Sequence, residues 1–211
     1  MGTNPLTFGI PSDEDFPFLI DCATSLIQRG KVETYDRLGE KLPEGWVIGA
    51  DGQAKTDPAQ ILEDFLEGAA ALAPLGGIGE EGGGHKGYGY AATVEILSSA
   101  LSGANFLKAL TDVRDGEKVK QNLGHFFIAI DISFFRAAEE FKKNTGEILR
   151  RLRNSKPAPE RQKIYTAGEK EYISKQKRRQ SGIPILPATA EELKTIIAEN
   201  GLADKWSKLL D

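Results

Sequence analysis

The chain has 211 residues, 40% hydrophobic and 27% charged, which is an ordinary globular composition that allows one core or a core with an added lobe. Its formal net charge of −4 provides no basic field for nucleic acid, and two histidines without ligand-like spacing predict no metal site. A single cysteine and the lack of a signal-like or membrane-spanning run favour a reducing, cytoplasmic location with no membrane partner.

The first elements are expected to be strands. Residues 6–10 predict a short strand after a turn, and the apolar residues 16–22 predict a second strand, followed by a helix that starts near Thr24 and runs through Ile27. Cys22 lies in this apolar run and is interpreted as a small buried residue, because free cysteine usually behaves as a core hydrophobe.

The next stretch contains a cationic turn and a helix. Arg29-Gly30-Lys31 has two open interpretations, a contact with cofactor phosphate or two solvated charges. Residues 38–52 are turn-rich. Residues 58–66 predict a short helix with Thr56 or Asp57 as its cap and a proline near its first position.

Residues 82–90, with the sequence GGGHKGYGY, lead into a predicted helix at 88–102. Consecutive glycines permit positive φ and a close approach of the backbone to a ligand. Free N–H groups at the helix start and the charge of Lys86 indicate an anion site. The alternative is an exposed glycine-rich turn with a solvated lysine. The stretch is not a Walker loop, since no Ser or Thr follows the lysine, nor is it the usual dinucleotide fingerprint.

After a polar loop at 105–120, residues 125–131 form a continuous apolar run, HFFIAID, that predicts a central strand. His125 is interpreted as a strand-end residue rather than a catalytic base, because no partner converges on it.

The C-terminal part is predicted to be helical, with a linker at 155–160 and an apolar docking tail at Trp206, Leu209 and Leu210. A capping box at Thr189 is expected to open the last helix, and Asn200-Gly201 to end it. The predicted helices are 136–153, 168–180 and 190–199. Strands interleaved with helices indicate the α/β class.

Ordered motifs extend over nearly the whole chain, and together they are far more specific than any one of them. They are Gly2-Thr3-Asn4-Pro5-Leu6, Asp21-Cys22-Ala23-Thr24-Ser25, Arg29-Gly30-Lys31-Val32, Thr56-Asp57-Pro58, Pro74-Leu75-Gly76-Gly77, Gly83-Gly84-His85-Lys86-Gly87-Tyr88-Gly89, Val94-Glu95-Ile96-Leu97, Leu101-Ser102-Gly103-Ala104 and Ile164-Tyr165-Thr166-Ala167-Gly168-Glu169. This set resembles the malate/L-lactate dehydrogenase family, which includes sulfolactate, ureidoglycolate and diketogulonate dehydrogenases and is distinct from the classical Rossmann dehydrogenases.

The resemblance implies a three-layer fold, a mixed sheet flanked by helices, with C-terminal helices that join a second lobe. Residues 1–154 are expected to be an NAD(P)-binding α/β domain, and residues 155–211 a helical segment that packs with the lobe completed by the family's N-terminal part. It also implies NAD or NADP as cofactor, a small 2-hydroxy acid as substrate and a homodimer. Because the family segment with the proton-transferring histidine has no counterpart here, no catalytic residue is assigned and the isolated chain is expected to be inactive.

By the same resemblance, three segments are expected to hold the dinucleotide. For the first segment, residues 21–23, the alternative interpretation is a strand end with a local cap. The carboxyl ends of strands are, however, where open α/β sheets hold ligands. The expected residues are Asp21, Cys22, Ala23, Gly84, His85, Lys86, Gly87, Gly168, Glu169 and Lys170. The alternative function is a non-catalytic dinucleotide-binding or interaction protein derived from the family.

Overall fold

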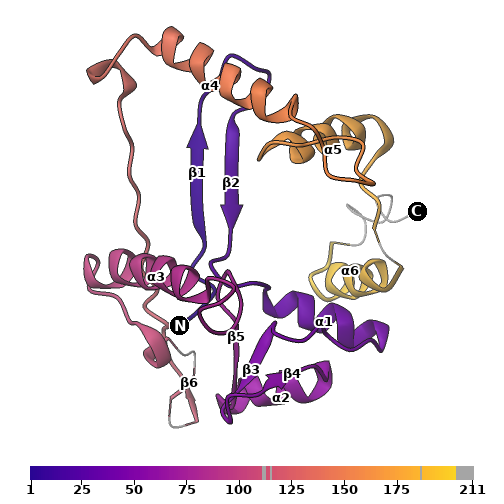
Figure 1. Cartoon of the computed structure of the whole chain (residues 1–211). Coiled ribbons are helices and arrows are strands. Elements are labelled where there is room, and N and C mark those ends of the chain that lie inside the picture. The colour runs from indigo at the N-terminus through magenta and orange to yellow at the C-terminus, as the bar shows by residue number, and fades with distance from the viewer. Residues whose placement is uncertain (111–112, 115, 186, 203–211) are drawn as a thin grey trace. The chain divides into compact units, whose positions relative to one another are not determined.

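A computed structural model describes residues 1–110, 113–114, 116–185 and 187–202 (Figure 1). The chain divides into two compact units, Met1–Arg151 and Leu152–Asp211. No helix among the described residues is both long enough and apolar enough to cross a membrane.

The first unit begins with a hairpin. Strands β1 (Leu6–Ile10) and β2 (Phe18–Cys22) pair antiparallel, with Leu6 opposite Cys22 and Ile10 opposite Phe18. Both strands lie where the sequence predicts them.

A small core follows the hairpin. Helices α1 (Arg29–Leu38) and α2 (Pro58–Glu67) pack together beside a three-stranded antiparallel sheet in the order β4 (Ala54–Lys55), β3 (Val47–Gly49), β5 (Ala70–Leu72). The buried centre of this core consists of aliphatic side chains from both helices, the sheet and the turn after α1. They are Val32, Leu42, Val47 and Ile61.

Helix α2 confirms its predicted start. The Asp57 side chain accepts a hydrogen bond from the Gln60 N–H at 3.2 Å, and Pro58 occupies the first turn, where its missing N–H costs nothing. The helix predicted to run through Ile27 is wrong. The Leu26 N–H donates to the Ala73 carbonyl and Ser25 pairs with Pro74, so this backbone is extended and α1 begins only at Arg29.

The glycine-rich stretch is more helical than predicted. Helix α3 (Gly84–Glu95) begins four residues earlier than the predicted 88 and continues through the wider turn η1 (Ile96–Ala100). Gly87 and Gly89 therefore lie inside a helix, and only the residues before Gly84 form the turn.

The central strand predicted at 125–131 is wrong for this chain, because these residues are extended but pair with no strand among the described residues. The surrounding region holds short elements, which are η2 (Leu107–Ala109), β6 (Val113–Arg114), β7 (Glu117–Lys118) and η3 (Ile132–Phe134). The α/β class is confirmed, and every recorded strand pairing is antiparallel.

Three helices form the C-terminal part, as predicted: α4 (Ala138–Arg153), α5 (Glu169–Ser181) and α6 (Pro187–Glu199). Because α6 begins at Pro187, Thr189 lies inside it and does not cap it. The predicted end is confirmed by Gly201, whose φ of 63° is left-handed. The predicted docking tail at Trp206, Leu209 and Leu210 lies outside the described residues.

Two glycines of α3 provide a matched test of its packing. A Cβ at Gly87 would overlap the Leu75 carbonyl oxygen and lie 2.6 Å from the Leu75 nitrogen, whereas a Cβ at Gly89 would meet nothing within 4 Å. We expect Gly87→Ala to lower the free energy of unfolding by about 1–3 kcal/mol through overpacking. Gly89→Ala should leave it unchanged or raise it by about 0.5–1 kcal/mol, because alanine favours the helix. Urea denaturation of both variants measures this, and equal effects would contradict the packing argument.

Candidate functional site

Thr24 joins three parts of the first unit. Its backbone N–H donates to the Thr3 carbonyl at 2.9 Å, and its hydroxyl donates to the carbonyls of Thr3 and Asn4 at 3.1 and 3.0 Å. Its own carbonyl accepts from the Leu75 N–H at 2.9 Å. With only 2% of its surface exposed, Thr24 holds the end of β2 between the start of the chain and residues 75–83, the glycine loop that precedes α3.

The glycine loop packs against the start of α3 through backbone alone. A Cβ on Gly76 would lie 2.5 Å from the Gly83 carbonyl carbon, and a Cβ on Gly84 would overlap the Gly77 carbonyl oxygen and lie 2.6 Å from that of Gly79. Such distances are far below van der Waals contact, so only glycine fits. The glycine density is therefore explained by the chain packing on itself, and it does not by itself require a ligand.

These contacts bring two of the predicted segments together. The Leu75 N–H donates a hydrogen bond to the carbonyl of Thr24, the residue after Ala23. The Leu75 backbone also lies against Gly87, in the first turns of α3. Gly84 and Gly87 are buried by the loop, whereas His85 and Lys86 are exposed. The end of β2 and the start of α3 thus form one site with an outward-facing cation.

The start of α3 fits an anion. Among the described residues, no acceptor is recorded for the N–H groups of Gly84 and His85, and no ion pair is recorded for Lys86. Unpaired N–H groups and the helix dipole give a 12-residue helix a partial positive charge at this end, to which Lys86 adds a full charge. This donor set suits the pyrophosphate of a dinucleotide.

Asp21 and Cys22 are placed less directly. The Asp21 carboxylate is exposed and accepts a hydrogen bond from the Thr7 hydroxyl across the hairpin at 2.7 Å. Cys22 is a free thiol and half-buried, so its predicted burial is observed only in part. Since β2 belongs to an antiparallel hairpin, the carboxyl-end rule of open parallel sheets does not apply to it. The bonds of Thr24 position this segment instead.

The two cations in the first turn of α1, Arg29 and Lys31, are exposed. Arg29 forms an exposed ion pair with Glu33 at 3.0 Å, and the Lys31 ammonium lies 5.4 Å from the centre of the Tyr35 ring. Exposed pairs of this kind contribute little stability. The contacts recorded here are with neighbours on the same helix, which favours the solvated interpretation.

The third predicted segment, residues 168–170, belongs to the other compact unit. Gly168, with φ at 91°, turns the chain into α5. Glu169 is 5% exposed, and its carboxylate lies 2.7 Å from the Lys163 ammonium and 3.8 Å from the Arg153 guanidinium. It also accepts the Thr166 N–H at 3.2 Å. The chain's own donors thus already surround this carboxylate, which makes it a structural group.

The electrostatics of Glu169 follow from this shell. Burial acts to raise the pKa of its carboxyl, but the hydrogen bonds from Lys163 and the Thr166 N–H, with the charges of Lys163 and Arg153, bring the pKa below its ordinary value. Lys170 remains exposed, and its ammonium lies 5.0 Å from the Tyr165 ring, against 4.8 Å for Lys163. Within this segment, Lys170 is the residue that offers an exposed charge.

Neither histidine is positioned as a catalytic base by a recorded partner among the described residues. His125 is exposed, so the expectation that it opens a buried strand is wrong; its ring lies 6.2 Å from that of Phe127. His85 is exposed in the first turn of α3. No group of acidic, histidine or cysteine side chains among the described residues is arranged to hold a metal ion.

Glu95 escaped sequence reasoning as a positioning residue, whereas Glu169 was expected to hold the dinucleotide rather than to have a structural role. Glu95 is buried in α3 and accepts from the Asn4 amide and the Leu107 N–H, each at 2.7 Å, so it fixes the helix to both neighbours. No local pattern marks it. The structural role of Glu169 could have been found from the sequence, because Thr166 and Glu169 have the spacing of a capping box. Of the two bonds of such a box, the one from the Thr166 N–H to the Glu169 carboxylate is present.

Comparison with known proteins gives a consistent result. The family model described as malate/L-lactate dehydrogenase matches residues 1–194. Malate dehydrogenase from Pyrococcus horikoshii is 40% identical over 202 residues, which cover 96% of this chain and 54% of the relative. Ureidoglycolate dehydrogenase (NAD(+)) from Escherichia coli is 30% identical over 185 residues, 88% of this chain and 49% of the relative.

Among solved structures, malate dehydrogenase from Entamoeba histolytica matches with a TM-score of 0.84 and 45% identity, covering 92% of this chain and 54% of that one. The chain therefore spans about half the length of the relatives it matches.

The buried carboxylate of Glu169 predicts a pH-dependent stability. A lowered folded pKa means that its stabilisation is present above the ordinary glutamate pKa and is lost as the pH falls through the folded value. Glu169→Gln should lower the free energy of unfolding by about 1–3 kcal/mol at neutral pH, and the difference should shrink below about pH 4. Glu171→Gln, at an exposed position of the same turn, should change little. Denaturant unfolding across the pH range measures both, and a constant difference for Glu169→Gln would contradict the assignment.

Proposed function

The chain belongs to the malate/L-lactate dehydrogenase family, and we propose that it is the nicotinamide-dinucleotide-binding part of an NAD(P)-dependent 2-hydroxyacid dehydrogenase. The proposal is supported above all by the joint placement of the β2 end and the α3 start, which Leu75 connects through its bond to Thr24 and its close approach to Gly87, with Lys86 exposed at that helix start. The matched relatives are named dehydrogenases, so an oxidoreductase is the activity that they support.

The chain's own residues have binding roles in this proposal. Lys86 and the N–H groups of Gly84 and His85 hold the pyrophosphate, and the buried backbone at Ala23 forms the wall beside it. When bound, the nicotinamide supplies the hydride acceptor or donor for the C2 carbon of the acid. In the second unit, Lys170 is the exposed cation of the third predicted segment, and Glu169 holds the turn that presents it.

The substrate that we propose is a small 2-hydroxy or 2-oxo acid of the malate or lactate type, in keeping with relatives named for malate and ureidoglycolate. We propose NAD or NADP as the cofactor; one relative's name specifies NAD(+). We also propose a cytoplasmic location and a homodimer; light scattering of the protein measures the oligomeric state.

Removing the charge at the start of α3 tests the binding site. Lys86→Ala should weaken NAD(P) binding about tenfold to a hundredfold, because it deletes a charge-assisted contact with phosphate. Lys41→Ala removes an exposed lysine from the turn after α1 and should leave the affinity unchanged. Calorimetric titration of the three proteins compares them. Equal affinities for wild type and Lys86→Ala would remove Lys86 from the site.

Activity separates a dehydrogenase from a non-catalytic binding protein. Hydride transfer requires the nicotinamide, the acid and a proton-transferring group to be held together, and general acid–base assistance alone contributes about 10²–10⁴-fold. We propose that this chain holds only the first of these. The 211-residue chain alone should therefore show little or no turnover with malate or lactate, and addition of the family's remaining half should restore it. Absorbance of the reduced cofactor measures this. Robust turnover by the chain alone, abolished by His125→Ala, would relocate the active site.

A further inference from the structure

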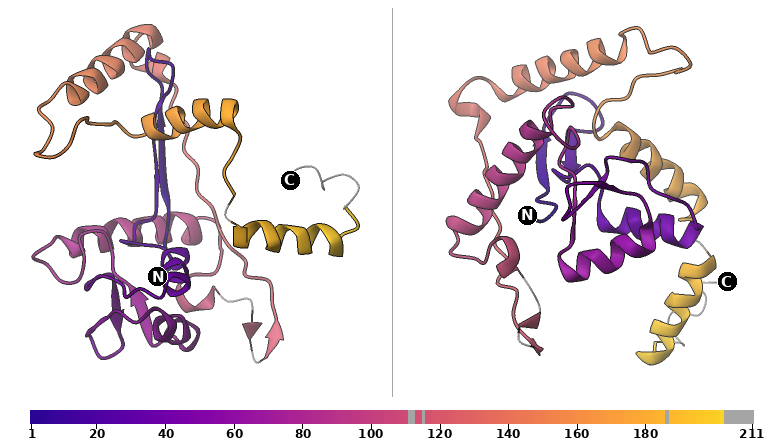
Figure 2. Two further views of the ribbon diagram at one scale, coloured as in Figure 1. Left: turned by 90° about the vertical axis from the view of Figure 1, so that its right-hand side faces the viewer. Right: turned by 60° about the horizontal axis from the view of Figure 1, so that its bottom comes forward.

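Asn4 ties the start of the chain to α3. Its side-chain amide donates to the Ala91 carbonyl at 2.9 Å and to the Glu95 carboxylate at 2.7 Å. Because Glu95 is only 9% exposed, water screens these bonds weakly, and each is stronger than the same bond at the surface. Figures 1 and 2 show the start of the chain beside α3, at the base of the hairpin β1–β2.

The backbone of Asn4 has a left-handed conformation, with φ at 40°. Among residues other than glycine, asparagine and aspartate adopt this region most readily. In this conformation the side-chain amide reaches α3, while the carbonyl of the same residue accepts the Thr24 hydroxyl at 3.0 Å. A single residue therefore connects α3 to the end of β2.

These bonds belong to a closed ring of contacts. From Thr24 the ring continues to the Leu75 N–H, which donates to the Thr24 carbonyl at 2.9 Å. The Leu75 backbone then lies against Gly87, so the ring returns to α3. All of its members lie in the first compact unit; they are Glu95, Asn4, Thr24, Leu75 and Gly87.

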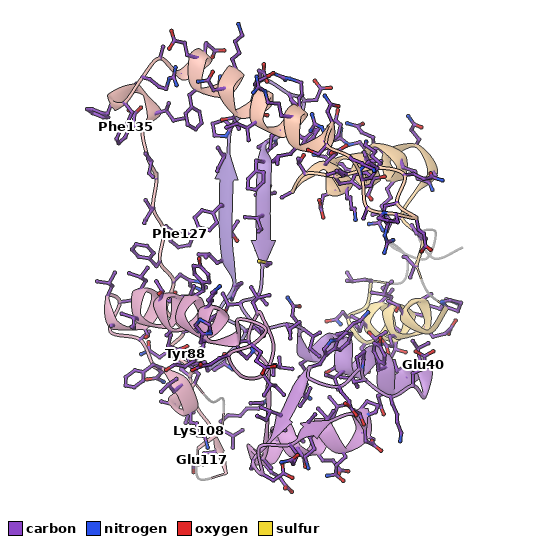
Figure 3. The ribbon with its side chains drawn as sticks, viewed as in Figure 1. Glu40, Tyr88, Lys108, Glu117, Phe127 and Phe135 are labelled. Atoms are coloured by element: carbon purple, nitrogen blue, oxygen red, sulfur yellow. The ribbon has the colours of Figure 1, made fainter. Side chains whose placement is uncertain are left out.

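The ring holds α3 at two points of one face. Gly87, Ala91 and Glu95 are four residues apart and buried, so they form a single stripe about 12 Å long. Anchors at both ends of this stripe fix the tilt of the helix and its rotation about its axis. Residues beside the stripe then face outward: Tyr88, labelled on α3 in Figure 3, is 59% exposed, and Lys86 is exposed as well.

A carboxylate suits the position of Glu95, because donors from two distant segments reach it. Its second oxygen accepts the Leu107 N–H at 2.7 Å, next to Lys108, which Figure 3 labels. A carboxylate accepts at both oxygens, whereas a glutamine would set its NH₂ group against one of the two donors. Glutamine at this position would therefore lose one of the two bonds.

We propose that Asn4 and Glu95 are positioning residues of the dinucleotide site, because they set the rotation of α3 and with it the direction of Lys86 and of the first N–H groups of the helix. The inference rests on the proposed function, since it names residues that orient the same site. Glu95 is buried and bonded to the chain's own donors, so it acts on binding through the placement of the helix and without touching the dinucleotide.

Exchanging the donor and the acceptor tests the pair. Asn4→Asp tolerates the left-handed backbone but sets a carboxylate against Glu95, so NAD(P) binding should weaken about tenfold or more. In the double variant Asn4→Asp/Glu95→Gln, the glutamine amide can donate to the aspartate while its oxygen accepts the Leu107 N–H. The double variant should therefore bind at least about threefold more tightly than Asn4→Asp. Asn4→Gly tolerates the same backbone, and by removing only the amide it should weaken binding about threefold or more, which keeps the test decisive if Asn4→Asp does not fold.

Ile61→Val is the matched control. It lowers stability through a small cavity in the core of α1 and α2, which shares no residue with the ring. Calorimetric titration should give this variant the wild-type affinity for NAD(P). Amide exchange at Leu75 is a second measurement, made without cofactor, and it should be about tenfold faster in Asn4→Asp than in Ile61→Val. Equal exchange in these two variants would contradict the ring.

Three binding results would also overturn the proposal. One is unchanged NAD(P) affinity in Asn4→Asp and Asn4→Gly while Lys86→Ala weakens binding, which would leave the proposed function intact. Another is equal weakening in Asn4→Asp and Ile61→Val, because binding would then follow stability alone. The third is a wild type that binds no NAD(P), which would overturn the proposed function together with this inference.

Discussion

The contact on which the candidate site depends is the one between the backbone at Leu75 and the first turns of α3. It forms because Gly87 has no Cβ, and it is extended by the equally close approach of Gly76 to Gly83 and of Gly77 to Gly84. On the other side, the Leu75 N–H bonds to the Thr24 carbonyl. Backbone atoms alone thus set the distance between the β2 end and the α3 start, which leaves the side chains of His85 and Lys86 facing outward. Their freedom for binding is a consequence of that packing.

Charges of the two units contribute differently. Glu169 is buried among Lys163, Arg153 and the Thr166 N–H, where a low dielectric strengthens each contact and an unpaired carboxylate would be costly. The ion pair of Asp13 with Arg150 lowers the pKa of Asp13 through its hydrogen bond, but both groups are exposed and solvent screens them. The hairpin tip is therefore held to α4 by its backbone bond to Lys142 at least as much as by charge.

The sequence predicts local structure correctly where one side chain caps or fits a backbone group a few residues away. Asp57 caps α2 three residues away, and Pro58 fits a first turn that needs no N–H. Prediction failed where distant backbone decides. Thr24 and Ser25 resemble a helix start. In the structure, however, the Thr24 backbone forms hydrogen bonds with Thr3 and Leu75, and Ser25 pairs with Pro74, so this backbone is extended. The candidate site also depends on distant backbone. The motif at 82–90 indicates a helix start, but its position near the end of β2 follows from long-range contacts through Leu75, which no local pattern encodes.

The segment 125–131 shows a third kind of outcome. Its apolar run is a property of its own residues and correctly describes a chain that must be covered on both faces. Strand pairing, by contrast, depends on a neighbouring strand, and among the described residues no strand pairs with this segment. The same distinction applies to the candidate site, because the exposed Lys86 and the unpaired N–H groups follow from the local sequence, whereas their position next to Leu75 follows from long-range backbone contacts.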